Sequence, residues 1–365
     1  MTYFPYMVFA RTRAQLARHC LTQSGMPTPP ASEFELNGPT RAIDAGYAGV
    51  EALPEFEARI AAMLRVDPSR VIATLGATGG MHLAAWRFFG PGTRVASETP
   101  SYEPLRALPQ AFGAETVLVE RDPAAGWRLD PARVRRALAG AERGHVFLTN
   151  SHNPTGALMS GQEIAALARE AELCRGVLVS CEVYLEFAEL GLRAPAFQVA
   201  PNTISISSLT KAYGLGGLRL GWMVLGEGLV GERASIMDLA YLTYVDLPTP
   251  ALRAGVLALD QLQRLRGPLE KVRRESRPLF VEWLAATNEL RSTEPALGLT
   301  AFPEVVGVTD TRALAEHLLE RFDVGVVPGE FFGRAGHLRV GFAQEPARLE
   351  QALSRLGEGI RDYLG

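Results

Sequence analysis

The stretch Arg70–Glu98, RVIATLGATGGMHLAAWRFFGPGTRVASE, decides the fold. It opens with RVIATLG and closes with TRVASE, two short runs rich in β-branched residues that are typical of strands. GGMHLAAWRFFG between them predicts a helix. A strand, a helix and a second strand of these lengths indicate an α/β unit in a largely parallel sheet.

The same alternation continues along the chain. Asp130 followed by Pro131 predicts one helix start, and Ser160 with Glu163 forms a capping box that predicts another. Helices of this kind would cover both faces of a mostly parallel sheet. The further strand candidates are ETVLVE (115–120), HVFLTN (145–150), GVLVSCEVY (176–184) and TISISS (203–208).

The pattern changes after residue 250. A helical region from about Ala251 to Asn288 is followed by short strand candidates, VVGVTD, VGVVPGE and HLRVGFA, and by a last helix. This pattern predicts a smaller α+β lobe joined to the large one by a long helix. The predicted division is an arm over residues 1–45 that belongs to the small domain, a large domain over 46–252 and a small domain over 253–365.

The composition of the 365 residues excludes several classes of protein. With 47% hydrophobic and 21% charged residues and a net charge of −3, nothing indicates a nucleic-acid or membrane surface. Three cysteines without metal-ligand spacing argue against a disulfide framework or a metal site. The apolar start is only nine residues long and its basic residues come after it, so we expect no signal peptide and a cytoplasmic protein.

Four segments hold the residues that could carry chemistry, because ligands of α/β proteins bind beyond the carboxyl ends of strands. Lys211 lies among small and apolar residues in a chain with very few lysines, where a lowered pKa would make its amine a nucleophile toward carbonyls. Taken alone, each glycine-rich segment is more often a tight turn than a binding site. The segments are GATGG (76–80), HNPTG (152–156), CEVY (181–184) and SSLTKAYGLGGLRLGW (207–222).

SLTKAYGLGGLRLGW, the upstream NPTG and the late HLRVGFA together resemble the class I/II aminotransferases of fold type I, which use pyridoxal 5'-phosphate. The resemblance runs from about Tyr47 to the last helix, with the motifs in the family's order. It implies a fold type I α/β enzyme that transfers an amino group from an amino acid to a 2-oxo acid. It also implies a homodimer with shared active sites, in which Tyr47 reaches the cofactor phosphate of the neighbouring subunit.

The resemblance implies a role for each matched residue. Lys211 would form a Schiff base with the cofactor and move the substrate's α-proton. Arg339 would bind the substrate's α-carboxylate as a bidentate pair, with Gly38 and Asn153 nearby. The remaining positions would hold the cofactor: Ala77, Thr78, Ser208 and Arg219 its phosphate, Tyr102 the face of its ring, and Asn153 and Tyr184 the ring's 3-oxygen.

Cys181 departs from the family's pattern, which has an aspartate there, paired with the ring nitrogen of the cofactor. The thiol could be a neutral buried group or a thiolate paired with the protonated ring. Glu182 could in principle reach over, but neighbouring residues of a strand point to opposite faces. Loss of the aspartate would weaken the ring as an electron sink and slow transamination. A lyase or racemase is therefore the alternative function.

A non-catalytic module that binds the cofactor or an amino acid is the rival from another class. Regulators of that kind need a DNA-binding segment, and the first 45 residues are too short and not basic enough to supply one. For the substrate, the aromatic and apolar stretches MTYFPYMVF (1–9) and MDLAYLTYVDLP (237–248) suggest an uncharged or aromatic side chain.

Overall fold

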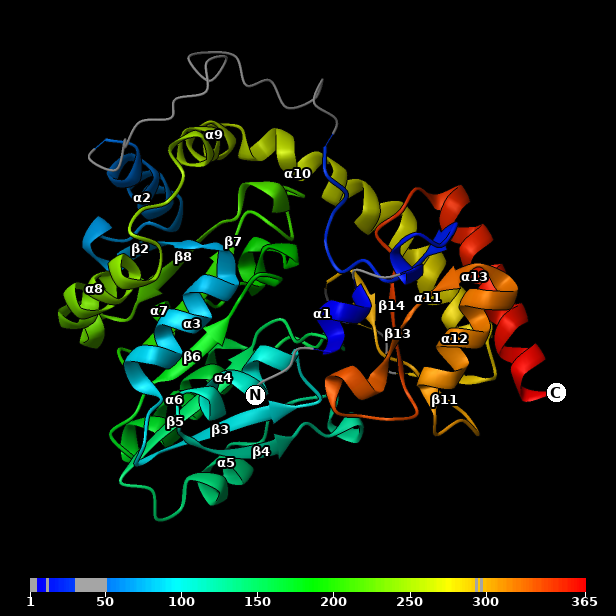
Figure 1. Cartoon of the computed structure of the whole chain (residues 1–365), viewed down its shortest axis with the longest axis horizontal. Helices are drawn as coiled ribbons and strands as arrows, with labels where there is room; N and C mark the ends of the chain where they lie inside the picture. The colour runs from blue at the N-terminus through cyan, green and yellow to red at the C-terminus, as the bar shows by residue number, and fades with distance from the viewer. Residues whose placement is uncertain (1–4, 11–12, 30–50, 293–294, 296–297) are drawn as a thin grey trace.

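A seven-stranded sheet forms the centre of the larger part of the molecule (Figure 1). The structure is a computed structural model that describes residues 5–10, 13–29, 51–292, 295 and 298–365. The strand order is β2-β8-β7-β6-β5-β3-β4; β3 to β7 are mutually parallel, and β8 is antiparallel to both its neighbours. The prediction of a mostly parallel sheet is confirmed. The strands are β2 Val71–Leu75, β3 Thr93–Thr99, β4 Glu115–Glu120, β5 Arg143–Thr149, β6 Leu178–Cys181, β7 Thr203–Ser208 and β8 Leu220–Leu225.

Hydrophobic side chains cover both faces of this sheet. Along β5, Val146 and Leu148 belong to one buried cluster, while Phe147 between them belongs to another. This alternation follows from the two-residue period of a strand. The helices of this part of the chain supply the opposing side chains: α2 Ala52–Leu64, α3 Gly76–Phe88, α4 Glu103–Ala111, α5 Pro131–Leu138, α6 Gly161–Leu173, α7 Ala196–Val199 and α8 Arg233–Tyr244.

The predicted helix starts at α5 and α6 are confirmed. The Asp130 carboxylate accepts from the Ala132 N–H at 2.8 Å. At α6, Ser160 and Glu163 form both hydrogen bonds of the capping box. These caps fix where each helix begins.

Strand β8 is absent from the prediction. All six of its residues are buried, so the sequence lacks the alternation of apolar and polar residues that marks a half-exposed strand. It pairs with β7 so that Gly221 lies opposite Ser208. The connection between these two strands carries Lys211, and the antiparallel return brings Arg219 back beside the end of β7.

The region from Ala251 to Asn288 is helical but broken. It comprises α9 Thr249–Asp260, α10 Leu262–Lys271, a π-helical turn Val272–Ser276 and α11 Arg277–Ala286. Pro268 inside α10 lacks the backbone donor that an unbroken helix needs. These helices run from the large sheet to the second lobe (Figure 1). The predicted boundary at 252/253 falls inside α9 and the one at 45/46 lies outside the described residues, so the division into domains stays a prediction.

The second lobe has only short strands. Its main sheet has the order β10-β14-β13, and β1 from the N-terminal part pairs in parallel with β12. Short helix α1 (Pro5–Ala10) lies between the lobes (Figure 1). The elements are β1 His19–Cys20, β9 Leu290–Arg291, β10 Thr300–Ala301, β11 Glu304–Val305, β12 Val324–Gly325, β13 Val327–Pro328, β14 Leu338–Gly341, α12 Thr311–Phe322 and α13 Pro346–Leu364.

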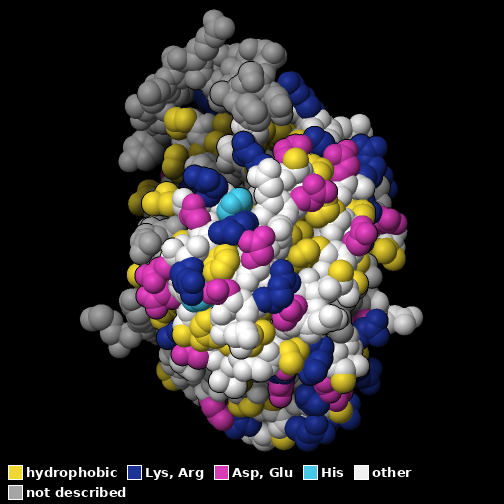
Figure 2. All heavy atoms as spheres, turned by 90° about the vertical axis from the view of Figure 1, so that its right-hand side faces the viewer, with side chains coloured by type: hydrophobic (Ala, Val, Ile, Leu, Met, Phe, Trp, Pro, Cys, Tyr) yellow, Lys and Arg dark blue, Asp and Glu magenta, His cyan; other side chains and the backbone are white. Residues whose placement is uncertain are grey.

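The outer surface of this lobe mixes positive and negative side chains (Figure 2). Arg321 and His317 of α12 both contact Asp362 of α13, at 2.9 and 3.1 Å. Exposed pairs of this kind contribute little to stability and leave no large field of one sign. None of the helices in the described ranges combines the length and apolar character needed to cross a membrane.

Candidate active site

Lys211 lies in the loop after β7 and reaches a cavity of about 430 Å³ beyond the carboxyl ends of β5, β6 and β7. Its Nζ donates to Ser24 Oγ at 3.1 Å and lies 5.9 Å from the centre of the Tyr184 ring. Burial of the ammonium group lowers the pKa of Lys211. The neutral, nucleophilic amine is therefore more accessible here than on a solvated lysine.

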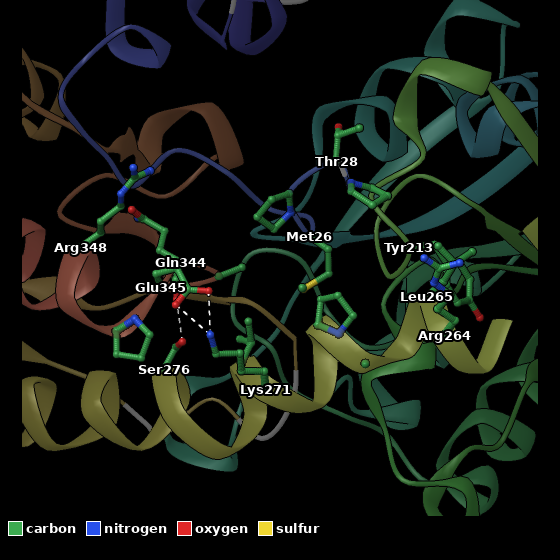
Figure 3. Close-up of a pocket in the computed structure, with 17 residues that line it drawn as sticks. Met26, Thr28, Tyr213, Arg264, Leu265, Lys271, Ser276, Gln344, Glu345 and Arg348 are labelled. Carbon is green, nitrogen blue, oxygen red and sulfur yellow. Dashed lines mark hydrogen bonds and ion pairs between the residues drawn. The ribbon is translucent and has the colours of Figure 1, made fainter. Parts of the chain in front are cut away.

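The chain's only other lysine has a different environment. Lys271 is exposed and forms an ion pair with Glu345, with Nζ 3.0 and 2.9 Å from the two carboxylate oxygens. That pair raises the pKa of Lys271. It borders a separate cavity of about 630 Å³ between α10 and the start of α13 (Figure 3). Of the two amine side chains, Lys211 alone has a lowered pKa.

Every predicted site residue that lies within the described part of the structure lines one cavity. Gly38 and Tyr47 lie outside the described residues. The other ten line the same cavity: Ala77, Thr78, Tyr102, Asn153, Cys181, Tyr184, Ser208, Lys211, Arg219 and Arg339.

One group of residues in the cavity suits an anion. The segment GATGG is the first turn of α3 rather than a loop, and no side chain caps this helix, so Ala77 and Thr78 lie among its unpaired N–H groups. Gly76 has a φ of +67°, and a Cβ on it would lie 2.8 Å from Arg219 Nη2. The glycine therefore leaves room for the guanidinium. A helix start, an arginine and the nearby Ser208 hydroxyl fit a phosphate group.

The middle of the cavity is lined by neutral groups. Burial raises the pKa of the Tyr102 and Tyr184 phenols, so both stay protonated as hydrogen-bond donors. Cys181 is 3% exposed, and burial raises the pKa of its thiol to about 12. Of the alternatives for Cys181, these surroundings favour the neutral thiol.

Glu182 is turned away from the cavity. Its carboxylate accepts from the Ala196 N–H at 2.8 Å, at the start of α7. Burial raises the pKa of Glu182 to about 7. This carboxyl group cannot take the place of the missing aspartate, as expected from the alternation of side chains along a strand.

Arg339 of β14 also lines the cavity. It is fully buried, and its Nη2 donates to the Tyr6 hydroxyl and to the Thr22 carbonyl, both at 2.8 Å. Nη1 donates to Asn153 Oδ1 at 3.4 Å. Within the described part of the chain, no carboxylate forms an ion pair with Arg339. A buried cation surrounded only by neutral acceptors is a strong site for an anionic ligand.

The sequence reasoning did not identify half of the cavity lining. Residues near the N-terminus were expected to lie near the substrate, but no pattern in MTYFPYMVF singles out Tyr6. The stretch 237–248 does not line this cavity; its Tyr241, Leu242 and Val245 are exposed. The lining residues that were missed are Tyr6, Met7, Gln15, Thr22, Gln23, Ser24, Met81, Thr149, Val183 and Thr210.

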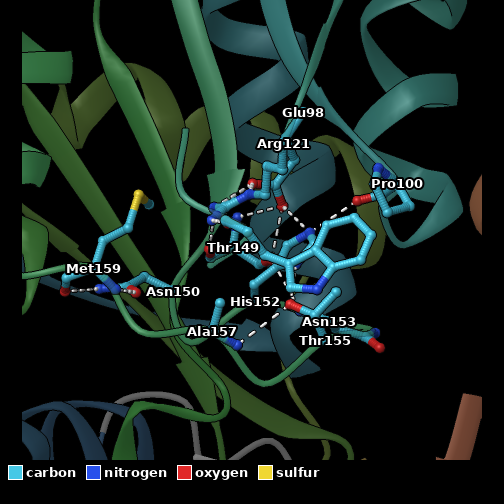
Figure 4. Close-up of polar contacts among 11 residues, drawn as sticks. Glu98, Pro100, Arg121, Thr149, Asn150, His152, Asn153, Thr155, Ala157 and Met159 are labelled. Atoms are coloured by element: carbon cyan, nitrogen blue, oxygen red, sulfur yellow. Dashed lines mark hydrogen bonds and ion pairs between the residues drawn. The ribbon is translucent and has the colours of Figure 1, made fainter. Parts of the chain in front are cut away.

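A buried polar network supports the cavity from behind (Figure 4). Arg121 donates from Nη2 to Glu98 Oε2 at 2.6 Å, with neither side chain exposed. The other oxygen of Glu98 accepts from the Thr149 hydroxyl at 2.7 Å and the Thr149 N–H at 2.8 Å. The network fixes the end of β5, where Thr149 borders the cavity and Asn153 follows.

His152 belongs to the same network rather than to the cavity. Burial lowers its pKa well below the ordinary value, so the ring is neutral. Its Nε2 lies 2.8 Å from the Pro100 carbonyl, which can only accept, so Nδ1 accepts from the Thr155 hydroxyl at 2.7 Å. These contacts give His152 a structural role.

Comparison with known proteins identifies the family. Residues 43–356 match the model of the family "Aminotransferase class I and II". The chain is 31% identical over 340 residues to capreomycidine synthase of Streptomyces vinaceus, covering 88% of this chain and 86% of that one. It is 29% identical over 347 residues to aspartate/prephenate aminotransferase of Thermus thermophilus, covering 91% and 88%.

Solved structures have the same fold. A PLP-dependent aminotransferase from Streptococcus suis superimposes with a TM-score of 0.91 at 24% identity, covering 99% of this chain and 98% of that one. Aspartate aminotransferase from Thermus thermophilus with maleate gives a TM-score of 0.82 at 26% identity, covering 98% and 97%. The chain belongs to the class I and II aminotransferase family of fold type I. It is an enzyme, a pyridoxal-phosphate-dependent aminotransferase.

Proposed function

We propose that this aminotransferase acts through Lys211. The ten cavity residues that were predicted from the sequence have, in this proposal, the roles that the resemblance implies. The observation that carries the proposal is the pairing of a lysine of lowered pKa with a buried arginine across one cavity. Bound pyridoxal phosphate supplies an aldehyde and an electron-withdrawing ring. Lys211 would bind the cofactor covalently and hold or release a proton at the substrate's α-carbon.

The phosphate and the carboxylate would bind at opposite ends of the cavity. Arg219, the start of α3 and Ser208 hold the phosphate in this proposal, with Tyr47 of a second subunit completing the site. Tyr102 lies against the ring, and Asn153 and Tyr184 donate to its 3-oxygen. Arg339 orients the amino acid by its α-carboxylate, with Asn153 beside it and Gly38 nearby.

The substrate that we propose is an α-amino acid with an uncharged side chain. Among the described residues that line the cavity, the charged groups are Lys211, Arg219 and Arg339, all of which have a role in this proposal. They include no carboxylate for a basic side chain and no further arginine for an acidic one. Tyr6, Met7 and other uncharged groups complete the lining and suit an apolar or aromatic side chain.

A lyase or racemase remains the second candidate, and Cys181 favours it. A neutral thiol does not hold a proton on the ring nitrogen as an aspartate would, so the carbanion at the α-carbon is stabilised less. One relative of this chain is named capreomycidine synthase rather than an aminotransferase. Reactions that need less electron withdrawal are compatible with the same cavity.

We also propose a cytoplasmic homodimer. The side chains of Tyr241, Leu242 and Val245 are 53%, 75% and 65% exposed around the end of α8, an apolar surface that suits a subunit interface. The three cysteines are free, in keeping with a reducing compartment.

The role of Lys211 can be tested by mapping where the cofactor is attached, because the chain has only two lysines. Borohydride reduction of the holoenzyme should fix one cofactor on the peptide that contains Lys211, because its amine is the one with a lowered pKa. Peptide mass mapping reads the position. Lys271→Ala should leave this label intact and Lys211→Ala should remove it. Retention of the label at full yield in Lys211→Ala would overturn the assignment.

A second measurement separates the two candidate reactions. The holoenzyme is mixed with single amino acids in the absence of any 2-oxo acid, and the cofactor is followed by its absorbance. Conversion of the cofactor to its amine form, with release of a 2-oxo acid, supports transamination. Return to the aldehyde form with a racemised or cleaved amino acid supports the second candidate.

A further inference from the structure

Tyr6 contacts the group that the proposed function assigns to the substrate carboxylate. It lies on α1 and is separated from Arg339 by 333 positions, yet its hydroxyl accepts from Arg339 Nη2 at 2.8 Å. The Arg339 guanidinium also lies 5.3 Å from the centre of the Tyr6 ring and 5.1 Å from that of Phe332. This contact brings the N-terminal helix directly onto the buried arginine.

The donors of Arg339 show what this contact excludes. A guanidinium has five N–H groups, and a two-point pair with a carboxylate uses one from Nη2 and one from Nη1 or Nε. Both hydrogens of Nη2 are taken, one by the Tyr6 hydroxyl and one by the Thr22 carbonyl. Nε is buried and has no hydrogen-bond partner among the described residues. A bidentate carboxylate can therefore bind only if one of the two Nη2 partners leaves.

The partner that can leave is Tyr6. Thr22 follows Leu21, whose N–H donates to the Gly325 carbonyl at 2.8 Å and whose carbonyl accepts from Gly341 at 2.7 Å, so its main chain is fixed in the second lobe. Tyr6 belongs to a helix of six residues that pairs with no strand, and its N–H lies 3.5 Å from a Glu103 carboxylate oxygen. Its ring packs against other aromatic rings, so displacement of the hydroxyl requires the phenol to turn within this aromatic group. The phenol can turn away without breaking a sheet.

We propose that the Tyr6 hydroxyl occupies the place of one carboxylate oxygen on Arg339 and that a carboxylate ligand must displace it. Tyr6 is then a positioning residue: it holds the buried guanidinium in place before substrate binds, and it competes with every substrate for the same N–H. This inference rests on the proposed role of Arg339. The cost of displacement is part of the binding free energy of any carboxylate ligand.

The test measures ligand binding to the holoenzyme by calorimetry. The probe is 3-phenylpropanoate, which has the carboxylate but no amino group and cannot react. Tyr6→Phe removes the hydroxyl and keeps the ring, so it should bind this probe roughly three- to tenfold more tightly than the native protein. The neutral amide 3-phenylpropanamide should bind equally to both. Tyr363→Phe makes the same change on α13, far along the chain, and should alter neither affinity.

Three outcomes would contradict the inference, and a fourth would contradict the proposed function instead. Unchanged or weaker binding of the carboxylate to Tyr6→Phe, or equal tightening for the amide, means that the phenol does not compete. Retained carboxylate affinity in Arg339→Ala would instead remove the assumed role of Arg339. In the native chain labelled with 3-fluorotyrosine, the fluorine signal that Tyr6→Phe eliminates should shift when the carboxylate binds. A signal that does not move also overturns displacement.

Discussion

Cys181 and Lys211 differ in charge type, but burial drives both of them toward the neutral form. Removing a charged group from water raises the pKa of the thiol to about 12 and lowers that of the amine. A neutral amine is what attack on an aldehyde requires. A neutral thiol, in contrast, has no negative charge that could stabilise a protonated ring nitrogen. The same physical cause thus favours one step of the chemistry and weakens another.

Replacing Cys181 by aspartate tests this view. If the native ring nitrogen faces a neutral group, Cys181→Asp should accelerate the half-reaction with an amino acid by at least about tenfold, or about 1.4 kcal/mol of barrier. The rate is measured by stopped-flow absorbance of the holoenzyme. Cys181→Ser, which is also neutral, is the control and should stay near the native rate. A slower Cys181→Asp enzyme would mean that the site is adapted to a weaker electron sink.

The sequence predicts the site residues that belong to motifs. It does not predict those that belong to no motif and reach the cavity only through the fold. Lys211, Asn153 and Arg339 stand in recognisable strings, and all three line the cavity. Tyr6 belongs to no such string, and its neighbour in space is 333 residues away. Thr149 was counted only as part of a strand, because nothing local shows that the strand ends at the cavity.

Helix α3 and the β7–β8 connection together create the proposed phosphate site, and a glycine makes their approach possible. Gly76 combines a positive φ with a guanidinium 2.8 Å from where its Cβ would be. Sequence reasoning placed GATGG in a loop, since glycines usually mark turns. The structure begins the helix at Gly76, whose positive φ is a conformation that glycine adopts without strain.

We expect Gly76→Ala to weaken cofactor binding by roughly tenfold or more, since the added methyl group would displace Arg219 and its charge-assisted contact. Gly126 has the same φ of +67° with nothing within 4 Å of its Cβ position. Gly126→Ala therefore reproduces the backbone strain, about 1 kcal/mol, without the collision. The dissociation constant for pyridoxal phosphate is measured by fluorescence titration of the apoprotein. Equal affinity of the two variants would contradict the proposed role of Gly76.

At the scale of the whole molecule, several titratable groups are buried, and their effects on stability differ in sign. Burial lowers the pKa of His145 on β5 to about 4. The unfolded chain therefore takes up a proton between pH 6.5 and 4 that the folded chain does not, and stability is lost as the pH falls through that range. Glu182, with a pKa raised to about 7, acts in the opposite direction there.

The contribution of His145 is isolated by comparing variants. His145→Gln keeps an acceptor for the Val177 N–H, which now donates to His145 Nδ1 at 3.2 Å. Its free energy of unfolding should depend less steeply on pH between 6.5 and 4, by up to about 1.4 kcal/mol per pH unit. Urea unfolding at several pH values measures the slope, with His19→Gln as the control. Parallel curves for native and His145→Gln proteins would show that His145 is not buried as a neutral ring.

The overall architecture can be predicted from the sequence better than some of its individual elements and connections. Repeated strand–helix units indicate the parallel sheet, since buried strands and capped helices are local patterns. Strand β8 was not predicted because its six buried residues show no alternation of apolar and polar side chains. The sequence reasoning treated residues 251–288 as one helical region and did not resolve the π-helical turn between α10 and α11.

Having only two lysines has a consequence for how the protein meets its cofactor. A free aldehyde condenses with any accessible side-chain amine. In an ordinary protein, each surface lysine therefore competes with the active-site lysine for the cofactor. Here the competition is reduced to Lys271, whose amine is held as an ammonium by Glu345. Arginine supplies nearly all of the remaining positive charge and does not condense with aldehydes so readily. Among the side-chain amines of this chain, Lys211 is therefore the one suited to condense with the cofactor aldehyde.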